Sequence, residues 1–404
     1  MTTMMKMLTA LAVVLALSGA ALAEEAKDAE DAKRISVGDM GWWKPGALLQ
    51  GWFLYDGYGE YYGKDSKGVA GVQDGVNAST FRIRRAELSV KGEILKSFIF
   101  GAMIDPAHVS ETKDTVVTIP DPKDPTKTST ATVKAPLGNL SALQDFWVGY
   151  TTEWADVAMG QFKIPVSYEG FNSSSKLLFP ERALVSKQYG DKRDVGIKVS
   201  KSFKYAGYVA GVWNGSGQNT LDTNNSKDLG LRLEAYPVKG LTVGGVAYYT
   251  AGERDDKTNA NMKIQDRYEV DLRYENYGVL FQAEYIMAND GKAGKNSKTG
   301  DAEVQETPGN GWYAALAYTF MDKLQPAIRY GELNLNTDKG WHQLDLSKAK
   351  PMARHLDVGL NYYIHKNEAK LQLAYSRIEY DGDKDGTKLI PLDNQVILAA
   401  QVSY

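Results

Sequence analysis

The 404-residue sequence contains no cysteine. This absence excludes disulfides, thiolate metal sites, cysteine nucleophiles and a lipid-modified N-terminal cysteine. After residue 23 the chain also lacks any apolar run close to the ~20 residues that a membrane-spanning helix requires. The acidic and basic side chains are also nearly balanced in number. The formal net charge is only −3, which gives no support for nucleic acid as a partner.

The first 23 residues have the pattern of a secretory signal peptide. Lys6 precedes an apolar run that starts at Leu8, and Ala21 and Ala23 form an A-x-A cleavage motif before Glu24. We therefore expect residues 1–23 to be removed, and the charged, Ala-rich residues 24–45 to form a periplasmic N-terminal arm. Low mean hydropathy does not make the exported chain soluble, because a membrane barrel places its apolar side chains at every second residue.

The rest of the chain repeats with a period of two residues. The segments 229–236, 267–274 and 355–364 alternate between apolar and polar side chains, and no stretch shows a comparable helical stripe. Two kinds of break separate such segments, and short and long breaks alternate along the chain. The short breaks lie at 95–97, 151–154, 203–205, 238–240, 276–278, 321–323 and 365–367. The long, polar breaks lie at about 57–79, 106–141, 168–191, 215–227, 252–264, 289–310, 334–352 and 381–393.

This pattern predicts an all-β fold over residues 46–404, a transmembrane antiparallel β-barrel of about 16 strands. The short breaks would be periplasmic turns and the long breaks external loops. Aromatic residues gather near the short breaks, as expected of a girdle at the membrane interface. The last segment alternates up to Tyr404 with no turn after it. We expect that strand to close the barrel against the first one, because an open edge in lipid is too costly.

Two stretches carry a resemblance to a known family. FRIRRAELSVKGEI (81–94) and GQFKIPVSYEGFNSSSKLLFPERALVSKQYGDKRDVGIKV (160–199) resemble the phosphate-selective porin O and P family. The second stretch is the more specific, with a G-Q-F-K-x-P strand end, a Ser-rich segment, E-R-x-L-V and then R-D-x-G. The resemblance implies a trimeric sixteen-stranded channel whose loop after the fifth strand, here 168–191, folds into the lumen.

Alternation predicts which side chains face the lumen when the apolar face is set toward lipid. On the second strand it places Arg85 and Lys91 inward and Arg84 outward, unless a bulge intervenes. On the fifth strand it places Lys163 inward and both Phe162 and Ile164 toward lipid. The family's channel arginines and lysines correspond here to Arg84, Arg85, Lys163 and Arg182. The full set of candidate pore or constriction residues is Arg84, Arg85, Lys91, Asp105, Lys163, Lys176, Arg182 and Lys187.

The predicted function is an outer-membrane porin for passive diffusion of small hydrophilic solutes, with a preference for anions and phosphate as a candidate. Basic side chains in a narrow lumen raise the local anion concentration. The expected partners are small solutes, outer-membrane lipid and two further copies in a homotrimer. No cofactor, metal site or enzymatic activity is expected. The alternative is a structural barrel filled by a partner, such as a sleeve for an exported electron carrier, since the lumen charges are mixed in sign.

Overall fold

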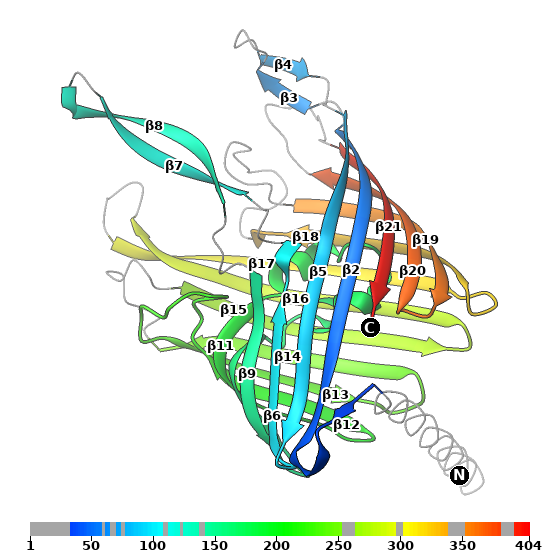
Figure 1. Cartoon of the computed structure of the whole chain (residues 1–404). Helices are drawn as coiled ribbons and strands as arrows, with labels where there is room; N and C mark the ends of the chain where they lie inside the picture. The colour runs from blue at the N-terminus through cyan, green and yellow to red at the C-terminus, as the bar shows by residue number, and fades with distance from the viewer. Residues whose placement is uncertain are drawn as a thin grey trace, which may run out of the picture.

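The computed structural model describes residues 33–58, 61–64, 70–73, 77–107, 112–121, 124–136, 142–252, 263–295, 302–337, 352–380 and 392–404. Sixteen of the described strands pair antiparallel, each with its neighbours in sequence, and form a closed barrel (Figure 1). The predicted all-β barrel and its strand number are confirmed. The expected signal peptide, residues 1–23, lies outside the described residues.

The sixteen strands of the barrel alternate in direction along the chain. They are β2 (Gly41–Tyr58), β5 (Asn77–Ile94), β6 (Phe98–Ile104), β9 (Leu143–Thr151), β10 (Asp156–Lys163), β11 (Arg193–Ser202), β12 (Ala206–Trp213), β13 (Lys227–Ala235), β14 (Leu241–Ala251), β15 (Lys263–Asn276), β16 (Val279–Lys295), β17 (Ala302–Tyr318), β18 (Leu324–Asn334), β19 (Met352–His365), β20 (Ala369–Tyr380) and β21 (Leu392–Ser403).

The last strand closes the barrel on the first, as the sequence predicts. β21 pairs with β20 on one side and with β2 on the other, in a register that sets Leu48 opposite Ser403. Beyond the strand, Tyr404 N donates to the Ala47 carbonyl at 2.9 Å. Every strand of the barrel therefore has two neighbours, which leaves no open edge.

The short connections are tight hairpin turns. Consecutive residues with positive φ lie in three of them, at Leu95 and Lys96, at Tyr277 and Gly278, and at Met321 and Asp322. Two positive φ values in a row match the right-handed twist of the flanking strands. Two of the predicted long loops hold hairpins of their own. These are β3 (Tyr61–Lys64) with β4 (Ala70–Gln73), and β7 (Thr112–Asp121) with β8 (Asp124–Pro136), at the end of the barrel away from the β5–β6 turn (Figure 1).

The two faces of the barrel wall differ in chemistry. On β13, Leu231 and Leu233 are 41% and 54% exposed, whereas Arg232 between them is 1% exposed. Large apolar side chains thus point outward and charged ones inward, as alternation predicts. Aromatic side chains near the short turns, Trp154, Tyr205 and Tyr277 among them, are exposed. No helix in the described part of the chain is long and apolar enough to cross a membrane.

The N-terminal part of the described chain runs directly into the barrel. The short strand β1 (Ile35–Ser36) pairs with β2, and the 3₁₀ turn η1 (Gly38–Met40) separates them. Residues 41–45, placed in the arm by the sequence prediction, lie in β2 and pair with β5 as far as Gly41 opposite Ile94. Lys33 forms an ion pair with Glu368 at a short turn, so the described end of the arm lies at the short-turn mouth.

Candidate pore constriction

A long segment, residues 164–192, connects β10 to β11 and contains three short helical elements. They are α2 (Tyr168–Phe171), the 3₁₀ turn η4 (Ser174–Lys176) and α3 (Leu184–Tyr189). Serines start the first two: Ser167 Oγ accepts from Gly170 N at 3.0 Å, and Ser173 Oγ accepts from Ser175 N at 3.3 Å. Such side-chain caps satisfy backbone donors that a helix start leaves open. We refer to residues 164–192 as the inner segment.

Carboxylates of β15 and β16 bind one side of the inner segment. Glu269 Oε2 accepts from Ser167 N at 2.6 Å, and Glu284 Oε2 accepts from Tyr168 N at 2.8 Å. Glu284 Oε1 also accepts from Ser186 Oγ at 3.1 Å. Arg232 lies 3.3 Å from Glu269 and compensates part of its charge.

Amides and a lysine of the opposite wall bind carbonyl groups of the same segment. Lys370 Nζ donates to Leu177 O at 2.8 Å and to Ser175 O at 3.0 Å. Gln401 Nε2 donates to Ser175 O at 3.0 Å, and Asn361 Nδ2 donates to Leu178 O at 2.9 Å. The inner segment is therefore held against the inner faces of strands on two sides, by acceptors on one and donors on the other.

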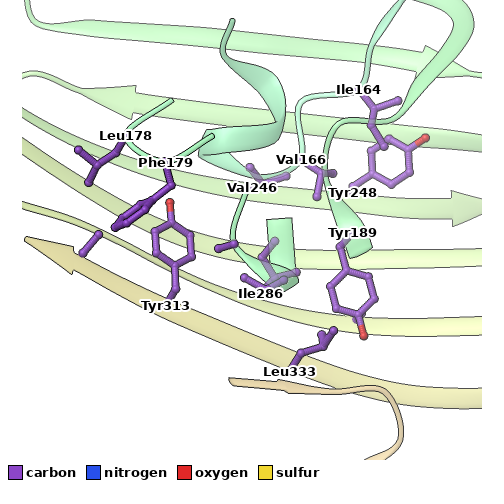
Figure 2. Packing of buried hydrophobic residues seen from close by; sticks show 14 of the residues in the cluster. Ile164, Val166, Leu178, Phe179, Tyr189, Val246, Tyr248, Ile286, Tyr313 and Leu333 are labelled. Atoms are coloured by element: carbon purple, nitrogen blue, oxygen red, sulfur yellow. The ribbon is translucent and has the colours of Figure 1, made fainter. Parts of the chain in front are cut away.

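Apolar side chains pack the remaining part of the inner segment against the wall. Val166, Phe179, Val185 and Tyr189 are buried with residues of strands β12 to β18, as Figure 2 shows for Tyr248, Ile286, Tyr313 and Leu333. Phe162 and Ile164 belong to this cluster and are 2% and 6% exposed. Their predicted lipid-facing orientation is wrong. Phe162 shares a face of β10 with the buried Ala158, whereas Val157 and Met159 on the other face are exposed, so the inner face of this strand is apolar. Ile164, just after β10, belongs to the same cluster.

Arg84 and Arg85 both reach the inner segment. The register of β5 against β2 shifts between Gln50 and Gly51, so that Arg84 is an extra residue in the ladder. This bulge is the condition under which Arg84 faces inward. Arg84 Nη2 lies 3.1 Å from Glu181 Oε2, and Arg85 Nη2 lies 3.8 Å from Glu181 Oε1. Two arginines of β5 therefore share one carboxylate.

A second carboxylate of the inner segment gathers three more basic side chains. Asp191 lies 2.9 Å from Arg182, 3.0 Å from Lys163 and 3.9 Å from Arg193. Lys163 also donates to Gly170 O at 2.6 Å, and Arg182 donates to Glu169 O at 3.0 Å. Lys163 and Arg182 thus hold the inner segment in place. Lys163 also lines a cavity of the barrel, whereas Arg182 is buried within the segment.

The other four predicted residues differ in their surroundings. Asp105 is 1% exposed and accepts from Ala86 N at 2.9 Å, so it braces a strand junction. The side chain of Lys187 is 60% exposed and lies 3.8 Å from Glu181. Lys91 and Lys176 are exposed and line the same cavity.

Two cavities meet at the inner segment. The upper cavity has a volume of about 420 Å³ and lies toward the long loops. Its charged lining consists of Arg84, Arg85, Arg193, Glu87, Asp105 and Asp191. The lower cavity has a volume of about 470 Å³ and lies toward the short turns. Its charged lining consists of Lys33, Lys44, Lys91, Lys163, Lys176, Arg193, Glu87, Asp145 and Glu368. Glu87, Ser174 and Arg193 line both cavities, so the two cavities adjoin at these residues.

The cations around the inner segment keep two of its carboxylates, those of Glu181 and Asp191, ionised. Burial raises the pKa of the Glu181 carboxyl, but its neighbours, Arg84 before Lys187, outweigh burial and lower the pKa to about 2. Burial acts on Asp191 in the same way. Lys163 and Arg182 nevertheless hold the pKa of that carboxyl well below its usual range. An ion pair with a basic group favours the charged form of an acid.

Several residues that position the inner segment were missed by the sequence analysis. They include Glu269, Glu284, Asn361, Lys370 and Gln401. In the sequence, each of these residues shows only that a polar or charged side chain stands at an inward position of a strand. Many other residues of the barrel share that property, so it does not single these out. Arg82 was missed as well; with Arg84 it stacks on the inward-facing Trp52, at 4.7 and 5.4 Å from the ring centroid.

The family model of phosphate-selective porin O and P matches residues 58–404 of this chain. The chain belongs to that family. The predicted resemblance is confirmed, and with it the localisation in the bacterial outer membrane and the general nature of the protein as a porin channel. No curated protein sequence matches the chain.

Solved porins share the fold of this family member at low sequence identity. The outer membrane channel DcaP of Acinetobacter baumannii is 12% identical with a TM-score of 0.58, over 92% of this chain and 99% of that one. Salmonella typhi OmpF, in complex with daunomycin, is 14% identical with a TM-score of 0.54, over 92% and 100%. An anion-selective porin from Comamonas acidovorans is 10% identical with a TM-score of 0.52, over 90% and 99%.

Proposed function

We propose that this porin allows passive diffusion of small hydrophilic solutes through a homotrimer, with a mild preference for anions, phosphate among them. The lower cavity carries the proposal. Six basic side chains line it against three acidic ones. The upper cavity is balanced, with three of each sign. The excess positive charge of the lower cavity would raise the local concentration of anions and lower their barrier to passage.

The inner segment would set the size limit of this channel. It occupies one side of the lumen with the apolar cluster and leaves a passage beside β2, β5 and β6. Its ion pairs and hydrogen bonds to strands on both sides support a fixed constriction that needs no covalent chemistry. The trimer rests on membership of the family.

The test is the zero-current potential of the purified protein in a planar bilayer under a potassium chloride gradient. We expect a potential of anion sign and a chloride current that falls when phosphate is added. Replacing Lys91 or Lys176 by Gln should lower the permeability ratio of chloride to potassium by about fourfold each. One unit charge roughly 10 Å from an ion in water changes the permeability of that ion by about twofold, and it acts on chloride and potassium in opposite directions. Lys239→Gln is the control, because Lys239 is exposed near a short turn but does not line the lower cavity.

Other results would separate the parts of this proposal. A potential of zero or cation sign, with full conductance, would leave a porin without an anion preference. A folded, heat-resistant oligomer that conducts no ions would instead favour the barrel filled by a partner.

A further inference from the structure

Two charged groups of the upper cavity have only long contacts with groups of opposite charge. Arg85 is 3% exposed, and its Nη2 has no hydrogen-bond acceptor among the described residues, since the Glu181 carboxylate that it shares with Arg84 lies 3.8 Å away. Its Nη1 is occupied by Gln50 Oε1 at 2.5 Å. Glu87, two residues further along β5, has one ion pair in the described part of the chain, a long one of 3.9 Å to Arg85 Nε. A buried donor without an acceptor is costly unless a solute or water supplies one.

The other charges around the cavity are engaged. Arg193 Nε donates to Asp145 at 2.8 Å, and Asp191 is held by Lys163 and Arg182. Asp105 accepts two backbone N–H groups, from Ala86 and Ala107. Arg84 is paired with Glu181 at 3.1 Å. Once these short pairs are counted, one cation, Arg85, and one anion, Glu87, are left with long ionic contacts alone.

We propose that the upper cavity is a binding site for a small zwitterion, an α-amino acid, during its passage through the channel. The carboxylate would bind Arg85 Nη2 and the ammonium group would bind Glu87. Both receptor groups lie on one face of one strand, roughly 7 Å apart along the backbone. A solute with its two charges on neighbouring carbon atoms fits such a pair. The cavity volume of about 420 Å³ suits a molecule of this size.

A balanced site discriminates in a way that a basic site does not. A simple anion bound at Arg85 would leave Glu87 unpaired and close to its own charge, and a simple cation at Glu87 would meet Arg85. Like charges placed together oppose binding, so the pair favours a solute that carries both signs. This inference rests on the proposed channel, since the solute must pass through it. It adds a solute class that the lower cavity alone would not select.

The experiment measures block of the chloride current in a planar bilayer by solutes added on the long-loop side. The probes are L-glutamine, its anionic derivative N-acetyl-L-glutamine and its cationic derivative L-glutaminamide. We expect glutamine to block at a concentration about tenfold lower than either derivative, the effect of one hydrogen bond to a charged group.

Two variants test the two halves of the site. Glu87→Gln should make the N-acetyl form block as well as glutamine does, and Arg85→Gln should do the same for the amide. Lys239→Gln is the control and should leave the order of the three probes unchanged, because Lys239 lines neither cavity.

The outcomes are distinct from those for the channel itself. If chloride flows but the N-acetyl form blocks as well as glutamine, the upper cavity is an anion site and the zwitterion proposal is overturned. If chloride flows and no probe blocks, there is no solute site in the upper cavity. If no current flows at all, the failure lies with the proposed channel.

Discussion

At the scale of single residues, Glu181 sets how much positive charge the upper part of the lumen presents. It is shared by Arg84 and Arg85 and also faces Lys187. Replacing it by Gln would keep the size of the side chain but release three basic groups from one carboxylate. We expect Glu181→Gln to raise the chloride-to-potassium permeability ratio at pH 7 by about fourfold, again the effect of one unit charge on two ions of opposite sign. Glu153→Gln, an exposed carboxylate in a short turn, is the control.

The pH dependence of this effect follows from the lowered pKa. An acid whose pKa falls to about 2 in the folded protein keeps its charge until the pH itself falls toward 2. The ion pairs of Glu181 are therefore complete above the ordinary carboxyl range and persist well below it. The difference between the native protein and Glu181→Gln should remain at pH 4. Its disappearance between pH 7 and pH 4 would show that Glu181 titrates as an ordinary carboxyl.

Single residues also show where the alternation of apolar and polar residues fails to predict which face a side chain occupies. The sequence placed Arg85 and Lys91 on their correct face, because a strand with one buried face has a fixed register. The inward orientation of Arg84 requires a one-residue bulge, and the position of a bulge is set by the pairing with the neighbouring strand. Phe162 failed for another reason. Alternation separates apolar from polar faces, but it cannot distinguish lipid from an apolar cluster inside the barrel.

At the scale of elements, the inner segment is held by backbone groups more than by its own side chains. Its N–H groups bind Glu269 and Glu284, and its carbonyls bind Lys370 and Gln401. Partners of this kind lie about a hundred residues or more away in sequence, so no local pattern predicts them. The sequence did indicate where the segment lies, because residues 168–191 form one of its long polar breaks; the connection itself runs from residue 164 to residue 192. That this loop folds inward came from the family resemblance alone.

Removing donors from one wall should loosen the inner segment. In the double variant Lys370→Met, Gln401→Leu, the buried carbonyls of Ser175 and Leu177 lose their side-chain donors, which costs about 1–3 kcal/mol for each unsatisfied group. We expect a larger and noisier single-channel conductance in a barrel that still assembles. Arg377→Gln, on the same strand in an exposed ion pair, is the control. An unchanged conductance would mean that these bonds do not fix the constriction.

At the scale of the whole molecule, stability depends on closure between the first and last strands. Residues of β21 pair on both sides, and Tyr404 bonds to Ala47 beyond the strand. Deleting residues 401–404 would expose unpaired backbone groups of β2 and β20 in the membrane, where each costs several kcal/mol. We expect loss of the heat-modifiable folded band on gels. Replacing Tyr404 by Phe, which keeps the backbone pairing, should preserve it.

The apolar cluster beside β12 to β18 divides the barrel into two unequal parts. The strands behind the cluster face side chains packed as in the interior of a soluble protein, where a change of volume is felt. The strands opposite, β2, β5 and β6, line the upper and lower cavities, and two smaller cavities lie along β10–β13 and along β15–β16. Variants that alter permeability should therefore concentrate on the residues that line these cavities. The rest of the barrel wall would then be a constant frame that tolerates substitutions on its lipid face but not on its packed inner face. The range of solutes that such a channel passes could therefore change between related proteins without a change of fold.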